Sequence, residues 1–235
     1  MTFYQVLSPY YNEIFPANEK QINFITSYLE KGHSVLDVGA GTGNVAEALV
    51  KRGMTVTAME PEKKMAAKIC EKAKIHERKF YVNTFGMQQI DNVSGLFDGI
   101  YCIGNTLVHL DNIEEIKDFI RKSLEKLKTG GKFIIQIVNY ERILIQKQFI
   151  FPEIQKEQFL FKRDYKIEGE KVIFTATLNV DGKEFSNSIS LYPITKNQLL
   201  PIIKECGFQS VEIYANFEKQ MYSTDGPALV IVAIK

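Results

Sequence analysis

The sequence has few cysteines and almost no net charge, and both features exclude classes of protein. Its three cysteines, Cys70, Cys102 and Cys206, are far apart and show no CxxC spacing. The sequence therefore predicts neither a disulfide framework nor a metal site, and a reducing compartment suits it. The formal net charge is +1, so no strong field would gather a polyanion, and we expect no nucleic-acid partner.

Long apolar runs are also missing. No stretch reaches the roughly 18 apolar residues of a membrane-spanning helix, and the segment from Met1 to Tyr11 has no basic region followed by an apolar run. We therefore expect a cytoplasmic protein without a membrane partner. No repeat or low-complexity tract interrupts the 235 residues, which suit a single α/β domain, as a monomer or a homodimer.

Helical and strand patterns alternate from about residue 18 to residue 139. The pattern predicts helices at 18–29, 44–52, 62–73 and 112–128, and strands at 34–38, 55–60, 80–83, 98–103 and 133–138. Gly130 and Gly131 are expected to end the helix that precedes them. The last strand is almost continuously apolar, which is typical of a parallel sheet that is covered on both faces.

The rhythm changes after residue 150. Three segments, 159–165, 172–178 and 185–191, read as antiparallel strands, and Asp181-Gly182 predicts a type I′ turn between the last two. A helix at 195–206 and strands at 211–217 and 228–234 close the chain. The predicted fold class is therefore α/β: a doubly wound, Rossmann-like, seven-stranded sheet, mostly parallel with its last strand antiparallel, and an antiparallel β insertion between core strands 5 and 6.

A glycine-rich run, Asp37 to Gly43, lies between a predicted strand and a predicted helix. Its glycines let the backbone turn tightly and approach a ligand where a Cβ would clash. The spacing is GxGxG, whereas dinucleotide sites use GxGxxG. Glu60 ends the next strand, where a carboxylate can accept hydrogen bonds from both hydroxyls of a ribose. A plain glycine turn and a nicotinamide site are the alternatives.

The run resembles the first motif of class I S-adenosylmethionine-dependent methyltransferases, and Glu60 resembles their ribose-binding acid. The resemblance implies that the loop packs against the methionine part of the cofactor and that Asp37 reaches the amino group. It implies that adenine is held by backbone near Met87 and by apolar packing, because residues 84–87 lack the acid that many relatives place there. The implied cofactor-binding residues are Tyr11, Asp37, Gly39, Ala40, Gly41, Thr42, Gly43, Asn44, Glu60, Pro61, Met65, Gly86, Met87, Cys102, Gly104 and Asn105.

Later clusters are similar to the glycine/sarcosine N-methyltransferase-like group of small-molecule enzymes. Gly104-Asn105-Thr106 resembles its Leu-Gly-Asn-Ser motif, and Asn139-Tyr140 resembles its Asn-Tyr pair. The resemblance, which covers about residues 30–235, implies that Asn139, Tyr140 and Tyr192 meet the methyl acceptor. His109 is a candidate base whose alternative is a structural role. Val138 replaces the arginine that holds the substrate carboxylate in that group, so glycine itself is not the expected substrate.

The resemblance implies S-adenosylmethionine-dependent methyl transfer to a small molecule, preferably an amine, with S-adenosylhomocysteine as the product. The alternatives are a nucleic-acid (tRNA) methyltransferase and a non-catalytic S-adenosylmethionine-binding protein. Arg142 or Arg163 could hold an acidic substrate, and the alternative for both is a solvated place on the surface.

The expected organisation is a single domain, 1–235, with four parts. These are an N-terminal lid and helix region at 1–30, a cofactor-binding core at 31–140, a substrate-covering insertion at 151–193 and a closing part at 194–235. The aromatic residues Phe3, Tyr4, Tyr10 and Tyr11 form either the lid or a packed arm.

Overall fold

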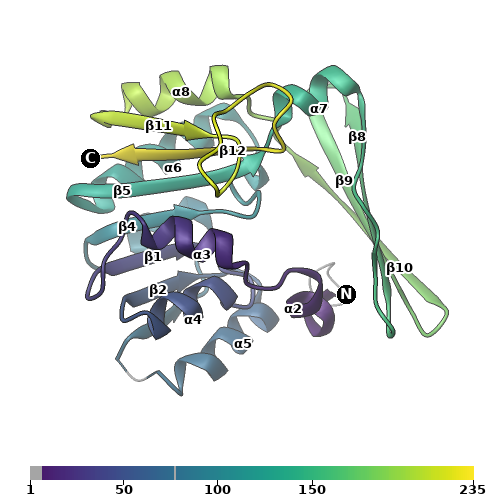
Figure 1. The fold of residues 1–235 in the computed structure, drawn as a ribbon, viewed down its shortest axis with the longest axis horizontal. Helices are drawn as coiled ribbons and strands as arrows, with labels where there is room; N and C mark the ends of the chain where they lie inside the picture. The colour runs from purple at the N-terminus through teal and green to yellow at the C-terminus, as the bar shows by residue number, and fades with distance from the viewer. Residues whose placement is uncertain (1–6, 77) are drawn as a thin grey trace.

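A seven-stranded sheet forms the centre of the computed structural model, which describes residues 7–76 and 78–235 (Figure 1). Its strand order is β11-β12-β5-β4-β1-β2-β3, and β12 is antiparallel to both of its neighbours while β1 to β5 run parallel. The strands are β1 (Ser34–Val38), β2 (Thr55–Met59), β3 (Phe80–Asn83), β4 (Phe97–Cys102), β5 (Leu127–Val138), β11 (Ser210–Tyr214) and β12 (Ala228–Ile234). The predicted fold class is confirmed; Phe3 and Tyr4 lie outside the described residues.

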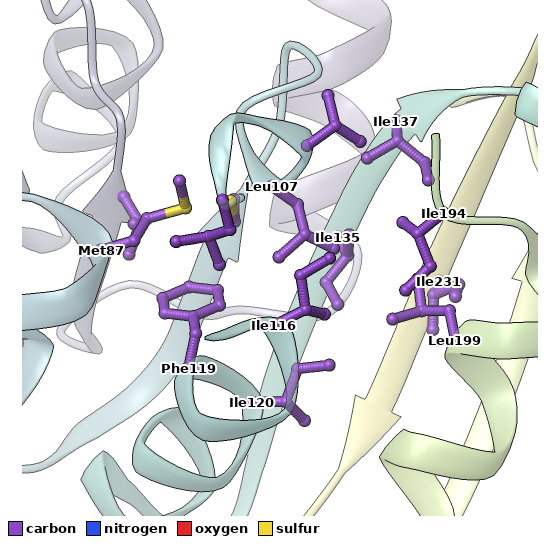
Figure 2. Packing of buried hydrophobic residues seen from close by; sticks show 14 of the residues in the cluster. Met87, Leu107, Ile116, Phe119, Ile120, Ile135, Ile137, Ile194, Leu199 and Ile231 are labelled. Atoms are coloured by element: carbon purple, nitrogen blue, oxygen red, sulfur yellow. The ribbon is translucent and has the colours of Figure 1, made fainter. Parts of the chain in front are cut away.

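Helices cover both faces of this sheet, as the continuous apolar strands predict. One buried cluster joins α6 (Ile113–Lys126) and α8 (Lys196–Glu205) to one face, and a second joins α3 (Glu19–Thr26), α4 (Asn44–Lys51) and α5 (Lys63–Ala73) to the other. Neighbouring residues of β5 alternate between the clusters: Ile135 and Ile137 pack with α6 and α8 (Figure 2), whereas Ile134 packs with the other set. The period-2 alternation of strand side chains explains this division.

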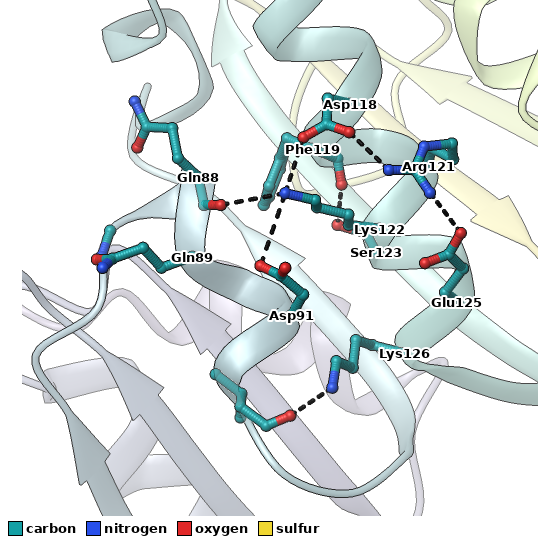
Figure 3. A network of polar contacts seen from close by, with 12 residues as sticks. Gln88, Gln89, Asp91, Asp118, Phe119, Arg121, Lys122, Ser123, Glu125 and Lys126 are labelled. Carbon is teal, nitrogen blue, oxygen red and sulfur yellow. Dashed lines mark hydrogen bonds and ion pairs between the residues drawn. The ribbon is translucent and has the colours of Figure 1, made fainter.

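Polar contacts tie α6 to the short helix η2 (Met87–Asn92) at the sheet surface. Lys122 Nζ lies 2.9 Å from an Asp118 oxygen and 3.6 Å from an Asp91 oxygen, so it bridges the two helices (Figure 3). These groups are partly exposed, and such surface pairs contribute only about 0–1 kcal/mol each. These contacts therefore matter mainly because they hold the segment that follows β3 against α6.

The expected end of α6 at Gly130 and Gly131 is wrong. The helix ends at Lys126, and β5 already begins at Leu127, whose backbone is extended and whose side chain is fully buried opposite Phe97. Burying that leucine between the sheet and the helix overrides the local glycine signal. Two further differences from the pattern are α7 (Tyr140–Gln146), which was not predicted, and β11, which ends at Tyr214 rather than at Phe217.

A second, antiparallel sheet is inserted in the chain between β5 and β11. It contains β6 (Gln148–Ile150), β7 (Ile154–Gln155), β8 (Leu160–Glu168), β9 (Lys171–Val180) and β10 (Lys183–Leu191). Asp181 and Gly182 both have left-handed φ values, 50° and 72°, as a type I′ turn requires. In Figure 1 these strands stand beside the sheet on the side where the N-terminal helix α2 (Tyr11–Ile14) lies. Leu7 and Ile14 share a buried cluster with Phe161 and Leu178, which joins the N-terminal segment to the insertion.

Candidate active site

The glycine-rich loop lies where β1 ends and α4 begins. Gly39, Gly41 and Gly43 have φ values of 77°, 60° and 74°. Residues other than glycine rarely adopt this left-handed backbone conformation. A Cβ at Gly39 would overlap the side chain of Thr106, and one at Gly41 would lie 2.8 Å from the Tyr11 hydroxyl oxygen. Two segments that are distant in sequence therefore close on the loop, which leaves no room for larger residues.

Glu60 lies at the end of β2 with both carboxylate oxygens held by backbone. Oε2 accepts the Gly41 N–H at 2.8 Å, and Oε1 accepts the Glu62 N–H at 2.9 Å. Burial raises the pKa of the Glu60 carboxyl to about 6, although both hydrogen bonds act against this. A carboxylate has about four lone-pair positions, so the side chain retains capacity to accept hydroxyl protons. Glu60 lines a cavity of about 150 Å³ together with Pro61 and Met65.

Asp37 is the second buried acid at the loop. It pairs in register with Tyr101 of the neighbouring strand β4, and its side chain is almost inaccessible. Burial raises the pKa of the Asp37 carboxyl to about 7; the Tyr101 hydroxyl opposes this rise and the charge of Glu60 adds to it. No ion pair within the described ranges includes either acid. Two buried acids without a protein cation, each lining a cavity, fit a ligand that carries both an ammonium group and hydroxyls.

Asn105 connects the loop after β4 to three other elements. Its φ is 68°, which asparagine tolerates better than most residues. Its Oδ1 accepts the Val138 N–H at 3.0 Å, and its Nδ2 lies 3.0 Å from the Tyr140 hydroxyl and 3.1 Å from the Tyr165 hydroxyl. Beside it, the Gly104 N–H donates to Gln136 Oε1 at 2.7 Å. These bonds join β4, β5, α7 and β8 at one point.

A cavity of about 700 Å³ opens from this point towards the insertion. Three parts of the chain line it: the loops at the ends of β1 and β4, the N-terminal segment around α2, and the inserted sheet with the segment before it. The insertion contributes Phe151, Phe161, Arg163, Tyr165, Phe174 and Leu191. Asp37, Gly39, Gly104 and His109 line it as well, and of these Gly39, Gly104 and His109 also line the smaller cavity, so the two spaces meet at the glycine loop.

His109 lies where the two cavities meet. The open cavity leaves the ring accessible, yet protein surrounds it on the other sides, and this burial lowers the pKa of His109 below its usual 6.5. A neutral imidazole at pH 7 can accept a proton.

The structure brings most of the sequence-predicted residues to these cavities. Those that line one or both are Tyr11, Asp37, Gly39, Ala40, Gly41, Thr42, Asn44, Glu60, Pro61, Met65, Gly104, Asn105 and His109. Those that line neither are Gly43, Gly86, Met87, Cys102, Asn139, Tyr140 and Tyr192.

The residues outside the linings have identifiable surroundings. Gly43 faces Ile69 and Phe80, so its missing side chain permits helix packing behind the loop. Met87 and Cys102 belong to the buried cluster beneath α6, which Figure 2 shows in part. Asn139 is fully buried, and its Nδ2 donates to the carbonyl oxygens that precede β12.

Tyr140 and Tyr192 lie outside the lining of both cavities. Tyr140 contacts two residues that line the larger one: its hydroxyl bonds to Asn105, and its ring stacks on that of Tyr165 with 6.2 Å between the ring centres. Tyr192 is half-buried, and the Lys171 ammonium lies 5.2 Å from its ring centre.

Several lining residues were not predicted as site residues. Gln136, Phe151, Tyr165 and Phe174 line the larger cavity. Thr106, which was named only as part of a motif, lines the smaller one, and Arg163 was expected only as one of two arginines that could hold an acidic substrate. The alternation in 159–165 indicates which residues share a face of the strand. It does not indicate whether that face meets the core or water, so the signal was present but incomplete.

Comparison with known proteins finds similarity to methyltransferases. Residues 35–131 match the family model described as a methyltransferase domain. Glycine/sarcosine N-methyltransferase of Aphanothece halophytica is 26% identical over 223 residues, which cover 90% of this chain and 80% of that one.

Two solved structures share the fold over nearly the whole chain. The CcbJ methyltransferase of Streptomyces caelestis is 21% identical, with 97% and 95% of the chains covered and a TM-score of 0.83. The S-adenosylmethionine-bound CalS10, an amino pentose methyltransferase of Micromonospora echinaspora, is 15% identical, with 100% and 99% covered and a TM-score of 0.72.

The sheet order, the glycine loop and its two acids define a Rossmann-like nucleoside-binding α/β protein. The match to the methyltransferase-domain model and the N-methyltransferase relatives support a class I S-adenosylmethionine-dependent methyltransferase, with S-adenosylmethionine as its cofactor. No helix in the described ranges is long and apolar enough to cross a membrane. Residues 7–76 and 78–235 contain no cluster of side chains suited to a metal ion.

Proposed function

We propose that the protein transfers the methyl group of S-adenosylmethionine to a small-molecule amine held in the larger cavity. The observation that carries the proposal is the position of that cavity. It meets the glycine loop at Asp37 and Gly39, and the inserted sheet lines its other side. Relatives whose names specify glycine, sarcosine or an amino pentose as substrate support an amine acceptor.

The residues of the loop suit the parts of the cofactor. We assign its amino group to Asp37, its ribose hydroxyls to Glu60, and its adenine to the apolar side chains of Pro61 and Met65, with backbone near Gly86 and Met87. Bound S-adenosylmethionine supplies an electrophilic methyl group on a good, neutral leaving group. The protein therefore has mainly to align the acceptor in line with that methyl group and exclude water.

The acceptor side of the site provides polar groups within an apolar wall. The polar groups are the side chain of Asn105 and the two hydroxyls that it contacts, those of Tyr140 and Tyr165. Phe151 and Phe174 contribute to the apolar part of the lining. An amine attacks only as the free base, so an ammonium acceptor must lose its proton before transfer. His109 is our candidate to accept that proton, because it lines both cavities and its lowered pKa favours the neutral imidazole.

The insertion and the N-terminal segment together act as the cover of the acceptor site in this proposal. Their shared buried cluster makes the cover continuous. A walled cavity of this size suits a small molecule better than a polymer, so we expect no nucleic-acid substrate. We further propose that the protein is a monomer or a homodimer in the cytoplasm. A reducing compartment suits its free cysteines, Cys70, Cys102 and Cys206.

The test is incubation of the purified protein with methyl-labelled S-adenosylmethionine and separate panels of amines, alcohols, thiols and tRNA. We expect label in amines and none in tRNA. Gly41→Val serves as the control that lacks a functional loop. Binding of the cofactor without transfer to any small molecule, or transfer to tRNA alone, would refute the proposal.

A further inference from the structure

Arg163 places a positive charge in the wall of the larger cavity. Side chains alternate along β8, so Phe161, Arg163 and Tyr165 share one face, with about 7 Å between successive members, and all three line the cavity. Across the sheet the register partner of Arg163 is Ala176. That small neighbour leaves the long side chain free to lie along the cavity wall.

Three aromatic rings lie close to the Arg163 guanidinium. Its carbon lies 4.8 Å from the ring centre of Phe151, 5.8 Å from Phe161 and 6.0 Å from Phe15. Its hydrogen bond to protein is a long one, 3.4 Å from Nη2 to the Pro152 carbonyl oxygen, and its Nε is buried without a partner among the described residues.

No acidic side chain in the described part of the chain forms an ion pair with Arg163. Burial lowers the pKa of the arginine, which agrees with a poorly solvated charge. A half-buried charge that water solvates incompletely carries a desolvation cost, so a ligand that supplies the missing contacts would bind favourably.

We propose that Arg163 binds an oxyanion, a carboxylate or a phosphate, of the methyl acceptor and thereby selects acidic amines. The inference rests on the proposed function. Arginine suits this role because its planar fork can donate two parallel hydrogen bonds to an oxyanion. Arg163 lies on the insertion, whereas the acids in the cavity lining, Glu19 and Asp37, lie on α3 and at the glycine loop. In the proposed function Asp37 holds the cofactor's amino group, so an acceptor held by its anion at Arg163 would point its amine towards the cofactor at the loop.

Arg163 thus supplies a positive charge that the core strand does not. Val138 occupies the end of β5, and it also lines the cavity. An anion bound at Arg163 lies against the insertion rather than against β5, so the acceptor must reach from β8 to the glycine loop. We therefore expect longer amino acids or aminoalkyl phosphates to bind better than glycine.

The experiment measures binding to the enzyme saturated with S-adenosylhomocysteine by calorimetry. The probes are glycine, β-alanine, γ-aminobutyrate and phenylalanine, each with its amide, and phosphoethanolamine with ethanolamine. We expect at least one anionic probe to bind at least tenfold more tightly than its neutral counterpart, because only the anion can accept charged hydrogen bonds from Arg163. The carboxylate and phosphate arms show which oxyanion is preferred.

Variants then assign the preference to Arg163. Arg163→Gln should reduce the ratio between anionic and neutral probes to within twofold, and Arg163→Lys should retain part of it. Arg142→Gln is the matched control: its guanidinium lies 5.3 Å from the Phe149 ring centre, but it lines neither cavity. This control should keep the preference of the original protein.

The outcomes separate this inference from the proposed function. Methylation of neutral amines without any anionic preference leaves the proposed function standing and refutes the role of Arg163. Failure to bind S-adenosylhomocysteine refutes the proposed function itself. Arg163→Met is a further variant of similar size without the charge. If every Arg163 variant loses S-adenosylhomocysteine affinity or thermal stability, the side chain only packs the cavity wall, and this result overturns the inference. So does a panel in which no anionic probe binds in an Arg163-dependent way.

Discussion

Replacing Asp37 by asparagine should stabilise the ligand-free protein while weakening its affinity for the cofactor. The side chain is 3% exposed, and burial raises the pKa of its carboxyl from 3.8 to about 7. A pKa difference of one between the folded and unfolded states corresponds to about 1.4 kcal/mol, so the ionised carboxylate lowers the free energy of unfolding by at most about 4 kcal/mol. Asparagine has nearly the same shape and no charge, so it removes the cost of burying the carboxylate.

The sign of the pH dependence follows from the raised pKa. The native state binds the Asp37 proton more tightly than the unfolded chain does, so this group makes stability fall as pH rises from about 4 to about 7. Above that range the full cost is present. The difference in unfolding free energy between Asp37→Asn and the original protein should therefore grow by about 2–3 kcal/mol between pH 5 and pH 8.

Thermal unfolding of both proteins at pH 5, 6, 7 and 8 measures this difference. A chain of this length changes its melting temperature by roughly 2–4 °C per kcal/mol, so the gap at pH 8 should be several degrees larger than at pH 5. Calorimetry at pH 8 should show S-adenosylhomocysteine binding about 10- to 100-fold more weakly to Asp37→Asn, because a charged hydrogen-bond acceptor is lost.

Two results would refute the reasoning about Asp37. A melting-temperature gap that does not change with pH would mean that the carboxylate carries no desolvation cost. An unchanged affinity for S-adenosylhomocysteine would mean that the carboxylate does not hold the amino group. The affinity of the original protein should also rise with pH through about 7, as Asp37 ionises.

Three further substitutions test other parts of the site. Glu60→Gln should weaken S-adenosylhomocysteine binding by about 1–3 kcal/mol, measured by calorimetry, and an unchanged value would refute the ribose assignment. Gly41→Val should abolish binding in a folded protein, whereas Gly169→Val, at the same φ of 60° but with open space around it, should bind normally; circular dichroism checks the folding of both. Tyr165→Phe removes one hydrogen bond to Asn105, so kcat should fall about 3- to 10-fold while cofactor affinity stays within twofold; equal losses in both would place Tyr165 in the cofactor site.

Local sequence signals were sufficient for the framework of this protein. The apolar periodicity of the helices and strands from 18 to 139 predicted the parallel core, because it depends only on which face of each element must be buried. The loop at Asp37 to Gly43 was recognisable because its backbone needs positive φ values that glycine supplies. Asp181-Gly182 predicted its hairpin for the same reason. These features are encoded within a few neighbouring residues.

Features that depend on distant contacts could not be obtained in this way. Leu127 joined β5 instead of the preceding helix because its side chain is buried opposite Phe97, a residue 30 positions earlier in the numbering. The surroundings of Asn139 depend on carbonyls that precede β12. The sequence around Leu127 or Asn139 does not indicate which distant residues will contact them.

The wall of the acceptor cavity shows the same division most clearly. The sequence determined that 159–165 is a strand and that Phe161, Arg163 and Tyr165 share one of its faces, because side chains alternate along an extended chain. Only the tertiary structure decided that this face turns towards the glycine loop rather than towards water. It did so by burying Phe161 against Leu7 and Ile14 of the N-terminal segment, since apolar area removed from water at that contact stabilises one orientation of the insertion over the other.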